Sequence, residues 1–179
     1  MNDQKENKRS LETGFVEAVI AGCKTDKGFA AKLRRADNPA TEYQSWEILG
    51  RFGIDIEKDY LRLPFLTVGS SIAKEKPERN GKVRLGKAIA NAFEGGNTSD
   101  QARTRLRRLL SCDEAAEVCR ILRPLLALIQ SRASKGEGVD HIRLLEQLRS
   151  FHFKSKQIKA QWAQDFYSQT LRKAEEAEQ

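Results

Sequence analysis

Residues 115–129, AAEVCRILRPLLALI, decide the fold class of this chain. Their apolar positions recur three and four residues apart, which is the spacing that places side chains on one face of an α-helix. The residues on that face are Ala115, Val118, Cys119, Leu122, Leu126 and Ile129. Pro124 lies inside the run, and because proline lacks the amide hydrogen of an ordinary helical residue, we expect a bend there.

The same spacing continues outward in both directions along the chain. Strict alternation of apolar and polar residues, the pattern of a half-buried strand, is absent. Ser10 can cap one helix and either Thr98 or Ser99 another, and Asn38-Pro39 is a typical helix start. The sequence therefore predicts an all-α fold, a compact helical bundle of about eight helices, including helices over 61–72, 83–93, 100–111, 139–151 and about 155–174.

The stretch KEKPERNGK, residues 74–82, interrupts this pattern. It contains Pro77 and Gly81 and none of the aliphatic or aromatic residues that a core needs, so it predicts an exposed loop. The 179 residues suffice for one domain. We expect a single domain over 1–179 with two lobes joined near residues 74–82, an N-terminal lobe of about 10–73 and a C-terminal lobe of about 83–175.

Positive charge is concentrated in three parts of the chain. The net charge is +7, from 32 basic and 25 acidic residues. Segments 24–35, 79–108 and 149–173 together hold 19 basic and 4 acidic residues, a net +15. The remaining residues are therefore net acidic. Such a balance of charge favours a polyanionic partner, either nucleic acid or an anionic membrane surface.

Helical spacing groups these cations into clusters. Like charges one turn apart repel by a few tenths of a kcal/mol, so a row without interleaved acids suggests an external anion. A single cluster of this kind is most often a solvated helix face, but four clusters with few acids favour nucleic acid. They are Arg84 with Lys87; Arg103 and Arg107, with Arg105 and Arg108 beside them; Arg120 with Arg123; and Lys154, Lys156 and Lys159 at the start of the last predicted helix.

No pattern in the sequence predicts catalysis. His141 and His152 are eleven residues apart and have no Cys or paired carboxylates near them, and His152 between two phenylalanines fits the edge of a core. The three cysteines do not have zinc-ligand spacing. We therefore expect no catalytic residue, no metal and no cofactor. The polar N-terminus and the lack of a long apolar run predict a cytoplasmic protein without membrane contact.

Several short segments resemble the CasB family, the small subunit of the type I-E CRISPR surveillance complex Cascade. The stretch VRLGKAIAN, residues 83–91, resembles the family segment LG[RK]A[LI]A. Residues 105–113 (RLRRLLSCD) and 121–126 (ILRPLL) resemble its next two helices, and 161–166 (QWAQDF) resembles its C-terminal helix. Residues 33–37 (LRRAD) resemble an N-terminal arginine pair.

The resemblance implies a non-catalytic subunit in antiviral defence, present as two copies within the complex. Family members brace the complex and hold guide RNA, target DNA and the displaced strand through basic residues, beside other Cascade subunits. The residues it implies here are Arg34 and Arg35, Arg84 and Lys87, Arg107 and Arg108, Arg120 and Arg123, and the cluster from Lys154 to Lys159. Two alternatives remain open: a small helix-turn-helix regulator that binds palindromic DNA, and a helical adaptor that binds only proteins.

Overall fold

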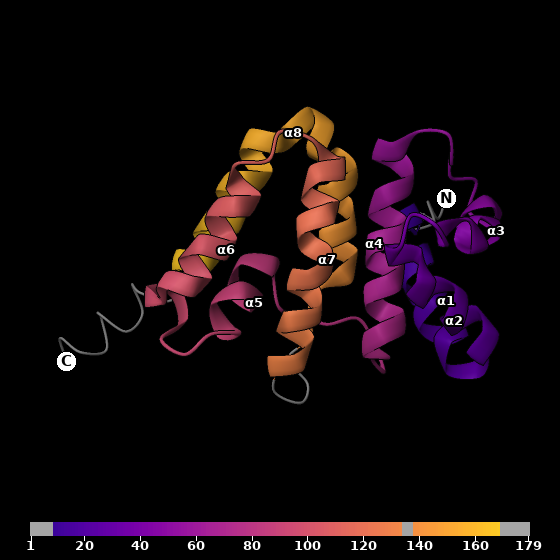
Figure 1. Cartoon of the computed structure of the whole chain (residues 1–179), viewed down its shortest axis with the longest axis horizontal. Coiled ribbons are helices and arrows are strands. Elements are labelled where there is room, and N and C mark those ends of the chain that lie inside the picture. Colours follow the sequence, from indigo (N-terminus) through magenta and orange to yellow (C-terminus); the bar gives the residue numbers. More distant parts are fainter. Residues whose placement is uncertain (1–8, 134–137, 169–179) are drawn as a thin grey trace, which may run out of the picture.

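The computed structural model describes residues 9–133 and 138–168 (Figure 1). Within these ranges there are eight α-helices, three short 3₁₀ helices and no strand, so the predicted all-α fold and helix number are confirmed. The elements are α1 (Leu11–Thr25), α2 (Lys27–Arg34), η1 (Arg35–Asp37), η2 (Glu42–Ser45), α3 (Trp46–Arg51), α4 (Asp59–Glu75), α5 (Leu85–Asn91), η3 (Gly96–Thr98), α6 (Asp100–Leu110), α7 (Ala115–Arg132) and α8 (His141–Tyr167).

A capping side chain explains the start of four of the eight α-helices in the described residues, which are α1, α2, α6 and α8. The side chain of Ser10 accepts a hydrogen bond from the amide of Thr13, and Ser99 accepts one from Ala102. The predicted helix start at Asn38-Pro39 is wrong. Asn38 Oδ1 accepts from the amide of Ala40, only two residues on, which closes a turn instead of capping a helix. The next elements begin later, at Glu42 and Trp46.

Helix α4 lies in the middle of the molecule, between α1–α3 on one side and α7 and α8 on the other (Figure 1). All of its residues from Pro64 to Ala73 are buried. A helix that is buried on every face needs neighbours on every face. One continuous hydrophobic cluster accordingly contains residues from α1 through α8, on both sides of the 74–82 segment.

Polar contacts also cross the middle of the molecule. The guanidinium of Arg123 on α7 donates to the backbone carbonyl of Asp37 (3.0 Å), and the carboxylate of Asp37 pairs with Lys74 on α4. The 74–82 segment ends in a close approach of two loops. There the amide of Val83 donates to the carbonyl of Gly138 (3.1 Å), and that of Asp140 donates to the carbonyl of Val83 (2.9 Å).

Helix α8 bends sharply at Lys154, whose φ of −128° and ψ of 26° are not helical. Beyond the bend, Trp162 Nε1 donates to Gln147 Oε1 (2.9 Å), and the rings of Phe151 and Trp162 stack 5.9 Å apart. In a straight helix, residues 147 and 162 would lie about 22 Å apart. We call residues 141–153 the first arm and residues 155–167 the second arm, and the two arms fold back on each other. Their bounds are close to those of the two helices that the sequence predicts separately. Residues 169–174 of the second predicted helix lie outside the described part.

The second arm and α5 approach each other closely at Gly86. A Cβ atom added at Gly86 would lie 2.1 Å from the carbonyl oxygen of Trp162 and 2.8 Å from the amide nitrogen of Phe166. Both atoms belong to backbone and cannot rotate away. The glycine therefore sets the distance between the two helices and allows Leu85 and Ile89 to be buried.

We predict that Gly86→Ala lowers the free energy of unfolding by about 2 kcal/mol or more, because the added methyl group forces α5 away from α8. Urea unfolding followed by circular dichroism measures the change. The matched control is Gly14→Ala in α1, where an added Cβ meets nothing within 4 Å. That control should stabilise the protein slightly, since alanine favours helix over glycine by up to about 1 kcal/mol. Equal effects at the two positions would contradict the packing argument.

A small polar cluster lies buried between α4, α7 and α8. Gln130 Nε2 donates to the hydroxyl of Ser71 (2.8 Å), which leaves the hydroxyl hydrogen to bond His141 Nε2 (3.2 Å). His141 is fully buried, and this burial lowers its pKa to about 4. The imidazole is therefore neutral in the folded protein at pH 7.

We predict that the free energy of unfolding decreases as the pH falls from about 6.5 to about 4. Over this range His141 takes up a proton in the unfolded chain but not in the folded one, and the loss reaches at most about 3 kcal/mol. Burial also raises the pKa of Glu75, which opposes the trend at the acid end of the range. Urea titrations at several pH values measure the slope. His141→Gln should flatten it, and an unchanged slope in that variant would refute the assignment.

Candidate nucleic-acid interface

A basic groove with an apolar floor lies between α6 and α7. Its volume is about 570 Å³. Arg105 and Arg108 from α6 and Arg120 from α7 supply its cations, and Ser111 and Glu117 complete the polar lining. The floor consists of aliphatic side chains of α7, which are Ile121, Pro124, Leu125 and Leu128. We call this feature the α6–α7 groove.

The helix packing of α6 explains why its arginines face outward. Ala102, Leu106 and Leu109 are fully buried against the rest of the bundle. They occupy one side of α6, and Arg105 and Arg108, one turn apart, project into solvent from the flank next to that side. The backbone under each guanidinium is therefore fixed by the core while the charged group remains in solvent.

The groove's three arginines lack carboxylate partners. The side chains of Arg105, Arg108 and Arg120 are exposed and form no ion pair or hydrogen bond within residues 9–133 and 138–168. The one acid of the groove, Glu117, accepts a hydrogen bond from the amide of Asp113 (3.3 Å) at the start of α7. Unpaired guanidinium groups beside an apolar surface are well suited to phosphate oxygens, which they can bind in bidentate fashion.

A second hollow of about 550 Å³, between the start of α4 and α7, differs in charge. It also contains Arg120, but its other two arginines are paired with its acids. Arg62 Nε lies 3.1 Å from Glu42 Oε1, and Arg62 Nη2 lies 2.8 Å from Asp59 Oδ1. Since its acids balance its cations, this hollow has no excess charge with which to attract an anion.

Four of the arginines predicted from the sequence also have protein partners. Arg84 Nη1 lies 3.1 Å from Asp165 Oδ1 on the second arm, although Arg84 is half exposed. Arg103 Nε donates to the carbonyl of Asn97 (3.0 Å) and so supports η3. Arg35 donates to Gln44 Oε1 (2.9 Å). Arg123, with only 15% of its side chain exposed, bonds Asp37 and Thr67, so we assign it to the α4–α7 contact rather than to the outer surface.

The remaining predicted cations are spread over several surfaces. Arg34 on α2, Lys87 on α5 and Arg107 on α6 are exposed, and none of them lines the α6–α7 groove. Lys154 and Lys156 are exposed at the bend of α8. Lys159 is mostly covered, with its Nζ 3.6 Å from Asp113 Oδ1 and above the ring of Phe151. In the α6–α7 groove, the structure thus brings together Arg108 and Arg120 of the predicted set.

The sequence predicts Arg107 as a nucleic-acid-binding residue, whereas in the structure Arg105 lines the groove. Arg103 and Arg107 have helical i, i+4 spacing, but their side of α6 does not face α7. The signal that points to Arg105 is its i, i+3 spacing with Arg108, together with the buried positions 102, 106 and 109. The prediction that His152 lies at a core edge is also wrong, since His152 is exposed and only its neighbour Phe151 is buried.

The cysteines and acids of the described chain give no reactive cluster. Burial raises the pKa of the Cys119 thiol to about 11 and also raises that of Cys112, so both thiols are protonated at neutral pH. Within the residues that the structure describes, no three His, Cys, Asp or Glu side chains are grouped as metal ligands. None of the helices described is both long enough and apolar enough to cross a membrane.

Comparison with known proteins identifies the family. The family model of the CRISPR-associated protein Cse2 matches residues 30–167, more than half of the chain. The chain belongs to the Cse2 family. The matched region contains both α5, the segment whose sequence resembles CasB, and the helices that form the α6–α7 groove.

The fold is similar to those of two solved structures. The crystal structure of M. ruber CasB is 25% identical in sequence, with a TM-score of 0.70 over 95% of this chain and 99% of that one. A chain of a CRISPR RNA-guided surveillance complex, 20% identical, shares the fold with a TM-score of 0.68 over 93% of this chain and 97% of that one. No curated protein matches the chain. The Cse2 match and these folds confirm the resemblance to CasB that the sequence indicated.

Proposed function

We propose that this Cse2 family member is a non-catalytic subunit of a type I-E CRISPR RNA-guided surveillance complex that binds nucleic-acid backbone in its α6–α7 groove. The observation that carries the proposal is the convergence on one groove of three exposed arginines that have no carboxylate partner within residues 9–133 and 138–168. The partners are guide RNA and target DNA, held beside other Cascade subunits. Two copies act together within each complex, in the cytoplasm and in antiviral defence.

Binding of this kind tolerates any base sequence. Arginines that contact phosphate oxygens fix the position of a strand but obtain no information from its bases. The floor of the groove is aliphatic and carries no amide or hydroxyl group that could distinguish base edges; Ser111, at the rim, is the one hydroxyl of the lining. A subunit that must hold many different target sequences needs this property.

The polar cluster around His141 supports a non-catalytic role. Ser71 Oγ and Glu75 Oε2 both approach the same ring nitrogen, His141 Nε2, at 3.2 and 3.5 Å. In a serine–histidine–acid triad the acid contacts the opposite ring nitrogen from the serine. Ser71 is also buried, so a substrate has no access to its hydroxyl. The cluster therefore serves the packing of α4 against α7 and α8.

We predict that Arg105→Ala with Arg108→Ala weakens binding of target DNA by the assembled complex, for all sequences alike. Loss of two phosphate contacts should reduce the slope of log affinity against log salt by about 1.4 to 1.8. Electrophoretic mobility shifts at several salt concentrations measure both quantities. The matched control is Arg51→Ala with Arg79→Ala, two exposed arginines outside the groove with the same change in net charge.

Three outcomes would contradict the proposal. If the control weakens binding as much as the groove variant, net charge rather than the groove attracts the DNA. If the groove variant fails to enter the complex, the groove is a contact between protein subunits, as in the adaptor alternative. If the loss is confined to one palindromic sequence, the helix-turn-helix alternative is favoured instead.

A further inference from the structure

The bend of α8 exposes a cluster of aromatic rings that the groove does not use. Phe153 has 80% of its surface exposed, the largest fraction among the exposed large hydrophobic residues of the described chain. His152 beside it is also exposed, and Tyr60 at the start of α4 is 39% exposed. We call Tyr60, His152 and Phe153 the apex cluster. Exposed aromatic groups in a cluster mark a binding surface more often than isolated ones do.

The rings of the apex cluster are held in place by one another. The rings of Tyr60 and His152 stack 5.7 Å apart, with 27° between their planes. His152 then meets Phe153 edge to face at 4.9 Å. Because Tyr60 belongs to α4 and the other two to α8, the arrangement depends on contact between these helices. Phe151 and Phe153 both precede the bend and lie two residues apart, about 200° of helix, so Phe151 is buried against Trp162 while Phe153 is turned to solvent.

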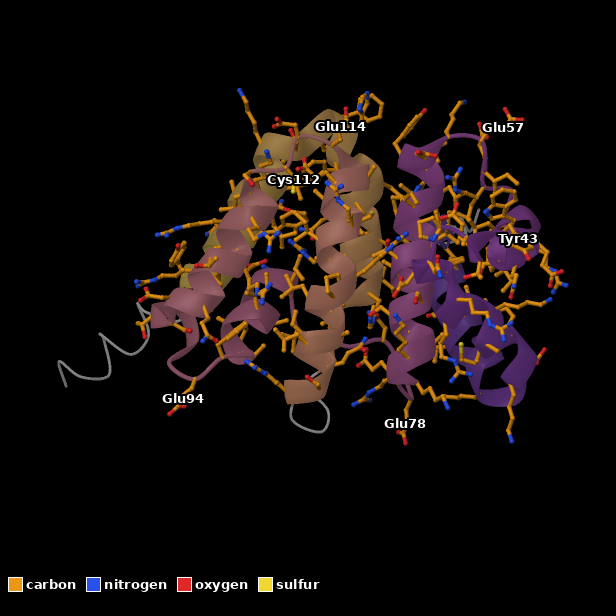
Figure 2. The ribbon with its side chains drawn as sticks, viewed as in Figure 1. Tyr43, Glu57, Glu78, Glu94, Cys112 and Glu114 are labelled. Atoms are coloured by element: carbon orange, nitrogen blue, oxygen red, sulfur yellow. The ribbon has the colours of Figure 1, made fainter. Side chains whose placement is uncertain are left out.

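Positive charge lies directly beside these rings. Lys154 and Lys156 are exposed and form no ion pair within the described residues. Of the nearby acids, Asp59 pairs with Arg62 and Asp113 pairs with Lys159. Glu57 and Glu114 remain exposed at the same end of the molecule (Figure 2). Two of the four acids at this end are thus paired, whereas the two lysines are available to an anion.

The apex cluster and the α6–α7 groove lie at the same end of the molecule. The contact between Lys159 and Asp113 joins the second arm to the loop that connects α6 and α7. Figure 1 shows that loop directly beneath the bend of α8, and Figure 2 labels Cys112 and Glu114 there. Ser111 of the same loop lines the groove. A strand leaving the groove at this end would pass the rings.

We propose that the apex cluster stacks an unpaired nucleobase, while Lys154 and Lys156 contact the phosphates on either side of it. This inference rests on the proposed function and assigns to it an unpaired strand as ligand. Aromatic rings bind any base through its flat face, and lysines beside them bind the backbone. A base inside a duplex is already stacked on its neighbours and cannot reach Phe153. The site therefore distinguishes single from double strands without reading sequence.

The test uses the assembled complex and a single strand that is not complementary to the guide. Phe153→Ala should weaken its binding about 5- to 150-fold, as expected for one stacked base. The salt slope should not change, because stacking releases no counterions. Affinity for a duplex of the same sequence should also remain unchanged. Phe153→Trp should restore binding, and a strand carrying 5-iodouracil should crosslink on irradiation to the peptide that contains Phe153.

The matched control is Tyr43→Ala. Tyr43 is 58% exposed and lies on η2, on the side of the molecule away from the bend of α8 (Figure 2). It should leave single-strand binding unchanged. Since Phe153 is almost fully exposed, its variant should unfold at the wild-type urea midpoint.

Several results would overturn the stacking site. The first is that Phe153→Ala binds the single strand with unchanged affinity. The second is that the variant loses as much affinity for the duplex as for the single strand. The third is that the variant fails to join the complex, which would make the rings a contact between protein subunits. Failure of the proposed function is distinguishable from these, because it would appear as an unchanged salt slope in the Arg105→Ala, Arg108→Ala variant. Lys154→Gln with Lys156→Gln should lower the salt slope and leave the crosslink position the same.

Discussion

The burial of residues 64–73 of α4 on every side is the constraint on which the rest of the structure depends. A helical segment without a solvent face must be enclosed, and no single neighbour can do this. Helices α1 and α2 cover one side, and α7 and the first arm of α8 cover the other. Two polar side chains of α4 have partners on α7 and α8, since Ser71 bonds Gln130 and His141 and Thr67 accepts from Arg123.

This requirement divides the basic residues into two groups. Arg123, Arg62 and Arg149 point inward and have acidic partners on other elements. They hold segments that are distant in sequence against one another. Arg105, Arg108 and Arg120 point outward without such partners. The net positive charge of the chain therefore overestimates how many basic residues are available to nucleic acid. Whether a given basic residue has an acidic partner within the protein shows which group it belongs to.

The sequence was sufficient for the features that depend on near neighbours. Apolar spacing predicts the helices, and the capping residues near positions 10 and 99 predict where two of them begin. Both effects act within one or two helical turns. The role of Arg123 could not be predicted, since its partner Asp37 lies 86 residues away. The exposure of Phe153 follows from helical spacing alone, since it lies about 200° around the helix from buried Phe151, but its contact with Tyr60 on α4 depends on residues far apart in the sequence.

The packing of α5 against the second arm of α8 has a consequence for the chain while it is being synthesised. Helix α5 has seven residues, too few to be stable alone, and it packs through Gly86 against Trp162 and Phe166. These partners are made about 80 residues later in the chain, so the contact has a high sequence separation and forms slowly. During translation, α5 and its buried residues must remain uncovered until the second arm has emerged. A nascent chain that stops before Trp162 thus exposes an apolar surface that chaperones and proteases can recognise.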